Sequence, residues 1–323
     1  MLSAVVRSLL IVGSVSSCLL AVDTPTAQTA AAPAPRPAPT HANVPYGDHP
    51  RQQLDFWAAP STHPTPVLFF IHGGGWVRGD KNDILKARLA DYLAAGISVV
   101  SINYRYTTQA QLAGVNPPVA WPIADAARAL QFVRSKASAW NLDKQRIAAS
   151  GGSAGACSSL WLAFHSDLAD PKSSDPIARE STRLFCVAAE RGQTTLDPAL
   201  LKAWTPNSVY GGHAFGLMDP KNVGTRDKQF DEFLRRRDEF LPFIKEYSPL
   251  EHVTADDPPV YLFYTNQPAL GRAQNDPTHS ANLGVKLKEK LDQVGVPCEF
   301  AYPGAPGVEH LDTLSYLKAR LLR

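Results

Sequence analysis

The stretch SGGSAGACSSLW, residues 150–161, follows a run of small and β-branched residues and continues into an apolar helical pattern. Its glycines, Gly151, Gly152 and Gly155, allow a backbone turn that is too tight for most residues with a side chain. We expect Ser153, at the apex of that turn, to present its hydroxyl at the edge of a sheet. Glycine and serine are also ordinary turn residues, so this stretch alone does not establish a site.

Apolar runs and helical patterns alternate on both sides of this turn, from Val44 to the end of the chain. This alternation predicts an α/β fold with a mostly parallel central sheet flanked by helices. The predicted strands are residues 66–71, 97–102, 146–149, 184–189, 260–264 and 298–302. The predicted helices are residues 82–95, 121–138, 154–166, 281–294 and 311–322.

Residues 194–257 are too many for an ordinary connection between two strands. They include three aromatic residues at helical spacing, Phe230, Phe233 and Phe240. We expect a lid-like insertion between the sixth and seventh strands of the sheet. The alternative is a peripheral helix whose aromatic residues only pack against the domain.

The N-terminal segment has the pattern of a secretory signal peptide. Residues 1–22 carry one positive charge, at Arg7, ahead of an apolar run that is too short and too interrupted to span a bilayer. Residues 23–43 are rich in Ala and Pro and predict an extended linker, and residues 44–323 the folded domain. We therefore expect a secreted or periplasmic protein without a membrane span. The lipobox-like sequence ending at Cys18 raises the alternative of a lipid anchor there.

The composition limits the partners of the chain. Its 32 Lys and Arg residues nearly balance its 30 Asp and Glu residues, which argues against a nucleic-acid partner. The other three cysteines, Cys157, Cys186 and Cys298, cannot all pair within one chain, and no spacing of Cys and His suggests a metal site. We expect neither a metal nor an organic cofactor.

A second glycine-rich motif, His72-Gly73-Gly74-Gly75-Trp76, follows directly after the predicted strand that ends at Ile71. Successive glycines leave backbone N–H groups unshielded, as the binding of an oxyanion requires. The turn at Ser153 and this motif together are a much more specific signal of a functional site than either of them is alone.

In these motifs the chain resembles α/β-hydrolases of the carboxylesterase and hormone-sensitive-lipase type, in the bacterial esterase and feruloyl-esterase-like branch. The resemblance covers residues 44–323 and lies in HGGGW at 72–76, INYRY at 102–106, GGSAG at 151–155 and YSPLEHV at 247–253. It implies that Ser153 is the nucleophile. It also implies that the backbone amides of Gly73, Gly74 and Ala154 form the oxyanion hole.

A serine hydroxyl needs a neighbouring imidazole to take its proton. Only His279 and His310 follow the predicted strand at 260–264. The resemblance favours His310, because it stands after the last predicted strand and directly before the final helix. For His72, we expect the role of holding the oxyanion loop.

The imidazole in turn needs a carboxylate to orient it. The family's acid position falls on Thr265–Gln267, which are neutral, so we expect the next acid, Asp276, to take the role. The alternatives are that Asp276 only caps a helix and that Glu309 is the acid.

These residues predict a serine hydrolase that cleaves carboxylic esters through an acyl-enzyme, with Ser153, His310 and Asp276 as its triad. Acetyl or feruloyl esters of carbohydrates are attractive substrates, and lipase or peptidase activity is an alternative. The rival from another class is a catalytically silent binding protein of the same fold.

Overall fold

The computed structural model describes Met1 and residues 37–323. The predicted signal peptide, Cys18 and most of the predicted linker lie outside the described residues, so export and lipid anchoring stay predictions. Within residues 37–323, none of the helices has the length and apolar character needed to cross a membrane.

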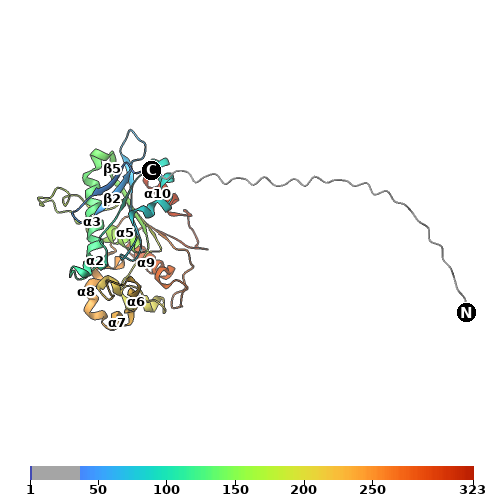
Figure 1. The fold of residues 1–323 in the computed structure, drawn as a ribbon. Helices are drawn as coiled ribbons and strands as arrows, with labels where there is room; N and C mark the ends of the chain where they lie inside the picture. Colours follow the sequence, from blue (N-terminus) through green and yellow to red (C-terminus); the bar gives the residue numbers. More distant parts are fainter. Residues whose placement is uncertain (2–36) are drawn as a thin grey trace. The chain divides into compact units, whose positions relative to one another are not determined.

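One sheet of eight strands organises the domain, in the order β1-β2-β4-β3-β5-β6-β7-β8 (Figure 1). The six strands from β4 to β8 in this order are parallel. Their carboxyl ends therefore meet at one edge, where ligands bind in open α/β sheets. The bounds are β3 (Thr65–Ile71), β4 (Ser98–Ile102), β5 (Leu142–Gly152), β6 (Cys186–Glu190), β7 (Val260–Phe263) and β8 (Cys298–Ala301). All six predicted strands are confirmed.

Two antiparallel strands at one edge, β1 (His41–Pro45) and β2 (Gln53–Trp57), were not predicted. Strand β1 takes in His41–Asn43, which the sequence pattern had assigned to the linker. The pairing is held partly by a side chain, because the Asn43 amide donates to Asp55 Oδ1 at 2.7 Å. Asp55 also forms a buried ion pair with Lys81 at 2.6 Å. A short polar strand whose pairing depends on residues distant in the sequence has little local pattern by which it could be predicted.

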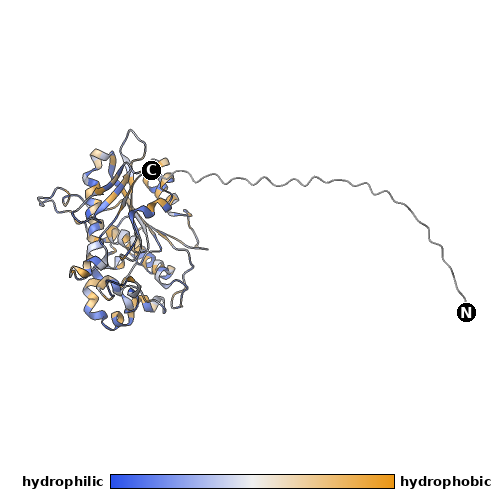
Figure 2. Ribbon diagram, viewed as in Figure 1, coloured by the Kyte–Doolittle hydropathy of each residue, from blue (hydrophilic) through white to orange (hydrophobic). Residues whose placement is uncertain are grey.

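Apolar side chains cover both faces of the sheet. Along β3, Phe69 belongs to the cluster packed by α3 (Ala120–Ser135), α5 (Ala154–Phe164) and α9 (Ala281–Val294). Its neighbour Leu68 belongs to the cluster packed by α1 (Leu89–Ala94) and α10 (Thr313–Leu321). This alternation follows from the two-residue period of a strand. Figure 2 shows hydrophobic and hydrophilic residues mixed along the helices, as expected of helices with one buried face.

The remaining helical segments are short. The predicted helix 82–95 is divided into a 3₁₀ turn, η1 (Lys81–Lys86), and α1, with Arg88 in the left-handed region between them at φ 60°. The others outside the insertion are α2 (Thr107–Leu112), α4 (Ala137–Trp140) and η5 (Pro277–His279).

The long insertion lies between β6 and β7, as predicted. It forms α6 (Pro198–Trp204), α7 (Phe230–Arg235) and α8 (Arg237–Tyr247), with the 3₁₀ turns η2 (Gly212–Phe215), η3 (Val223–Thr225) and η4 (Pro249–His252). Figure 1 shows α6, α7 and α8 gathered at one end of the domain. The ring of Phe233 lies 5.6 Å from that of Phe240 and 5.3 Å from that of Phe215. These aromatic residues belong to the same hydrophobic cluster as the main core on that face of the sheet, so the insertion packs continuously with the domain.

Candidate active site

Ser153 occupies the sharp turn between β5 and α5. Its backbone has φ 55° and ψ −122°, a conformation that costs energy for a residue with a side chain and that persists only where its surroundings enforce it. The Ser153 amide donates to the Glu190 carbonyl on β6 at 2.9 Å. A Cβ atom at Gly155 would lie 2.0 Å from the Ile71 carbonyl oxygen, so glycine is required where α5 begins against the end of β3. Close backbone packing thus fixes the serine at the sheet edge.

His279 and Asp276 extend from Ser153 in a hydrogen-bonded chain. His279 Nε2 lies 2.9 Å from Ser153 Oγ, and His279 Nδ1 lies 2.7 Å from Asp276 Oδ2. Asp276 directly precedes the turn η5, which Pro277 begins and His279 ends. A 3₁₀ turn has three residues per turn, so residues i and i+3 lie on the same side. The sequence Asp-Pro-Thr-His therefore aligns its carboxylate with its own imidazole.

Contacts from two other segments hold this turn against the sheet edge. The buried Gln193, just after β6, donates to the Thr278 carbonyl at 2.7 Å. Asn207, in the insertion, exchanges two hydrogen bonds with the backbone of Gln274 at 2.8 and 3.0 Å. Ser280 caps α9 directly after the turn. These contacts fix the distance between the imidazole and Ser153.

The structure contradicts the prediction that His310 lies beside Ser153. His310 Nδ1 lies 2.7 Å from Glu299 Oε2, and the His310 carbonyl accepts a hydrogen bond from Tyr261. Glu299 and Tyr261 are paired within β8 and β7, whereas Ser153 lies beyond the carboxyl end of β5. The loop after β8 turns back along the strand, and it carries His310 away from the edge where Ser153 lies.

Asp276 contacts an imidazole, as expected of the acid, but this imidazole is that of His279 and not that of His310. Asp276 makes no side-chain capping bond to the turn it precedes, so the capping alternative is wrong. The other alternative, Glu309, lies beside Glu299 and His310. Donor atoms of these three side chains lie within 4.8 Å of one another and form a possible ligand set for a metal, apart from Ser153.

The predicted oxyanion residues surround the serine. Gly73, Gly74, Gly152, Ser153 and His279 line a pocket of about 640 Å³. A Cβ atom at Gly73 would lie 2.6 Å from the Gly152 carbonyl oxygen and 3.5 Å from Ser153 Cβ, so the two glycine-rich segments pack backbone to backbone. Ala154 is the first residue of α5, where backbone N–H groups have no acceptor within the helix.

Buried polar side chains support the glycine loop from behind. Tyr104 donates from its hydroxyl to the His72 carbonyl at 2.9 Å, and its ring stacks on that of His72 at 4.1 Å. His72 Nδ1 lies 2.8 Å from the Gly73 carbonyl oxygen. Burial lowers the pKa of His72 to about 4, so this imidazole is neutral near pH 7. His72 therefore holds the loop, as predicted.

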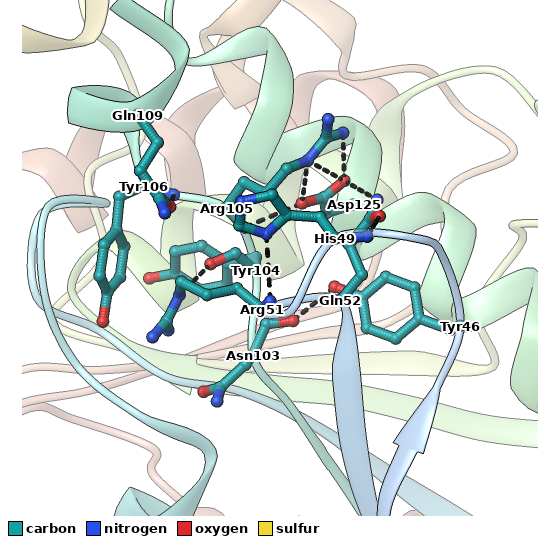
Figure 3. Close-up of polar contacts among 10 residues, drawn as sticks. All are labelled: Tyr46, His49, Arg51, Gln52, Asn103, Tyr104, Arg105, Tyr106, Gln109 and Asp125. Carbon is teal, nitrogen blue, oxygen red and sulfur yellow. Dashed lines mark hydrogen bonds and ion pairs between the residues drawn. The ribbon is translucent and has the colours of Figure 1, made fainter. Parts of the chain in front are cut away.

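A second layer of contacts holds Tyr104 in turn (Figure 3). Arg51 donates from Nε to the Tyr104 carbonyl at 2.7 Å, and its guanidinium lies 3.8 Å from the centre of the Tyr106 ring. Arg105 binds the buried Asp125 carboxylate through Nη2 at 2.6 Å and Nε at 2.9 Å. This network joins the segment after β4 to α3 and to the loop between β1 and β2.

The sequence contains a local signal for the position of His279. A proline-initiated turn that carries Asp and His three residues apart can form a carboxylate–imidazole pair locally. The pattern Asp276-Pro277-Thr278-His279 fits this description.

Comparisons with known proteins agree with the fold. A family model described as BD-FAE matches residues 54–287. The probable carboxylic ester hydrolase LipM of Mycobacterium tuberculosis is 27% identical over 238 residues, which are 71% of this chain and 48% of LipM. Esterase LipC of the same organism is 28% identical over 230 residues, 68% of this chain and 49% of LipC. The chain thus spans about half the length of the curated relatives it matches.

Esterase 2 of Thermogutta terrifontis, phosphonylated by sarin, has the same fold, with a TM-score of 0.62 at 22% identity over 88% of this chain and 93% of that one.

Proposed function

Since the chain belongs to the BD-FAE family of α/β-hydrolases, we propose that it hydrolyses carboxylic esters through an acyl-enzyme formed on Ser153. The observation that carries this proposal is the chain of hydrogen bonds from Asp276 through His279 to Ser153, with distances of 2.7 and 2.9 Å. A serine hydroxyl paired with an imidazole that a carboxylate orients is the arrangement that activates serine for acyl transfer.

The mechanism assigns one step to each group. His279 Nε2 accepts the proton of the Ser153 hydroxyl as its oxygen attacks the ester carbonyl. The negative charge that develops on the carbonyl oxygen is stabilised by the backbone amides of Gly73, Gly74 and Ala154. His279 then gives its proton to the departing alcohol, and Asp276 stabilises the imidazolium in between. Water, activated by the same imidazole, releases the acid.

The lining of the pocket supports small or polar esters rather than long-chain lipids. It consists of glycines, Ser153, Thr278, His279, three arginines and two aspartates. Within the described part of the chain, no large apolar side chain lines this pocket. A binding site for a long acyl chain would need such side chains. We therefore propose acetyl or feruloyl esters of carbohydrates as the substrate class and set lipase activity aside.

If the chain were a catalytically silent binding protein, nothing would require Ser153, His279 and Asp276 to contact one another. The structure instead has Ser153, His279 and Asp276 in hydrogen-bonding contact, at a turn with a strained serine. Strained backbone of this kind concentrates at functional sites. The geometry thus supports an active enzyme.

The proposal is tested by covalent labelling and a series of esters. A fluorophosphonate should label the protein at one site, and mass spectrometry of the digest should find the added mass on the peptide that contains Ser153. Among 4-nitrophenyl esters, acetate should be cleaved with a higher kcat/KM than dodecanoate. Absence of labelling, together with no hydrolysis of any ester, would support the silent binding protein.

Asp276→Asn is expected to lower kcat by about 10⁴, because a neutral amide neither stabilises the imidazolium nor selects its tautomer. The change is nearly isosteric, so the turn at Pro277 should persist. Glu309→Gln, at the alternative acid, is the control and should keep kcat within about threefold, since surface substitutions remote from a site have small effects. The measurement is kcat for 4-nitrophenyl acetate. A collapse in Glu309→Gln with a near-normal Asp276→Asn would move the acid to Glu309.

A further inference from the structure

Three arginines from separate parts of the chain line the pocket that contains Ser153: Arg78, Arg191 and Arg226. Arg78 follows the glycine-rich loop, Arg191 follows β6, and Arg226 belongs to the insertion between β6 and β7. The catalytic steps described above use none of them. Three arginines that meet at one pocket and take no part in catalysis indicate that the pocket binds a negatively charged group of a ligand.

The backbone and neighbouring side chains direct these residues to the site. The stem of Arg78 packs on the glycine loop, because a Cβ atom at Gly74 would lie 3.0 Å from Arg78 Cγ. Arg191 has φ 51°, a conformation unfavourable for arginine, and its amide donates to the Phe263 carbonyl at 2.8 Å. It comes directly after Glu190, whose carbonyl holds the Ser153 amide.

Arg226 is fixed beside the glycine loop. Its Nη1 would lie 2.9 Å from a Cβ atom at Gly75. Its guanidinium lies 5.3 Å from the centre of the Tyr210 ring and pairs with Asp227 at 2.6 Å. Arg226 therefore lines the pocket, but Asp227 compensates its positive charge.

Among the residues that the structure describes, two of the three pocket arginines lack an acidic partner, whereas both aspartates that line the pocket have a partner. Asp276 contacts His279, and Asp83 pairs with Lys86 at 2.7 Å. In residues 37–323, neither Arg78 nor Arg191 has a carboxylate within 4.0 Å. Two guanidinium groups without an acidic partner therefore face the pocket. A hollow of about 390 Å³ that shares Arg78 and Arg226 with this pocket is also lined by Lys228 and by Asp227, the partner of Arg226.

We propose, resting on the ester hydrolysis above, that the preferred substrates carry a carboxylate close to the scissile ester and that Arg78 and Arg191 bind it. A guanidinium presents several N–H donors in a planar fork that matches a carboxylate. A cleft lined by one sign of charge also concentrates ligands of the opposite sign. Acylated uronic acids and half-esters of dicarboxylic acids both have this chemistry.

Two matched substrate pairs distinguish these sources. For a carboxylate on the alcohol side, 4-acetoxybenzoate is compared with 4-acetoxybenzamide. For a carboxylate on the acyl side, mono-4-nitrophenyl adipate is compared with its methyl ester. In each pair the readout is the ratio of kcat/KM for the acidic ester to kcat/KM for its neutral partner. The pair in which the wild-type ratio is the larger identifies the side that carries the carboxylate.

The double variant Arg78→Gln, Arg191→Gln should lower that ratio by about 10-fold or more in the preferred pair, since charge-assisted hydrogen bonds are lost. Raising the salt concentration should lower the wild-type ratio but have less effect on that of the double variant, because ions screen exposed charges. Arg235→Gln, on the exposed surface of α7, is the matched control and should keep the wild-type ratio.

The outcomes separate this inference from the proposed function. If the neutral esters are cleaved in a Ser153-dependent reaction but the double variant keeps the wild-type ratio in both pairs, the carboxylate site is wrong and the esterase stands. If neither neutral nor acidic esters are cleaved, the proposed function fails, and the inference fails with it. A lowered ratio in Arg235→Gln would show a general charge effect and would also refute the assignment to Arg78 and Arg191.

Discussion

His279→Ala is expected to lower kcat for 4-nitrophenyl acetate by roughly 10⁶, the cost of removing the base from a serine hydrolase triad. His279 Nε2 is the nitrogen within 2.9 Å of the Ser153 hydroxyl. Without it, the hydroxyl has no acceptor for its proton when it attacks the ester. The residual rate should be the one that binding and the oxyanion hole sustain alone.

His310→Ala is the matched control, because His310 is also a partly buried histidine whose Nδ1 contacts a carboxylate, that of Glu299 at 2.7 Å. Its loss should cost some stability, about 1 kcal/mol for a hydrogen bond of this kind, and should leave kcat within a few-fold of the wild type. Thermal unfolding and kcat are measured for both variants. Near-normal activity in His279→Ala, with a large loss in His310→Ala, would restore the base that the family resemblance implied.

Ser153→Ala should lower kcat by a similar factor, about 10⁶. The serine and the histidine act as a unit, so removing either one abolishes nearly all of their joint contribution. The fold should persist, because Ala carries the same Cβ atom as Ser and the backbone amide of residue 153 keeps its bond to the Glu190 carbonyl. Labelling by the fluorophosphonate should disappear together with activity.

Ser150→Ala is the control for this change, because Ser150 stands three residues earlier on β5 and its side chain is buried, at 4% exposed, away from the hydrogen-bonded chain of Ser153. It should keep both labelling and most of the activity. Circular dichroism and thermal unfolding verify that each variant is folded. Retention of ester hydrolysis in Ser153→Ala would place the reaction at another residue and would refute the acyl-enzyme proposed here.

Short-range patterns determined much of the fold. The parallel strands could be predicted because most of them contain an apolar run that is buried on both faces, as in β3 and β4. Strand β8 is only partly buried and includes Glu299, but its apolar residues still alternate with the helical patterns on either side. The turn at Ser153 and the loop at Gly73 and Gly74 could be predicted because only glycine satisfies such close backbone contacts, and glycine is visible in a sequence. The pair β1 and β2 could not, since its strands are short and partly polar and their pairing depends on Asp55 and its distant partners.

The sequence by itself also predicted Ser153 at the sharp turn and, in Asp276, the acid that lies next to the imidazole. It did not determine which histidine reaches Ser153, because His279 and His310 both follow β7 and the answer depends on the path of two loops. The tertiary structure decided this: contacts from Gln193 and Asn207 hold the turn of His279 near Ser153, and Glu299 and Tyr261 hold His310 along β8. The convergence of Arg78, Arg191 and Arg226 was likewise invisible, since residues so far apart in the chain meet only where the parallel strands end together.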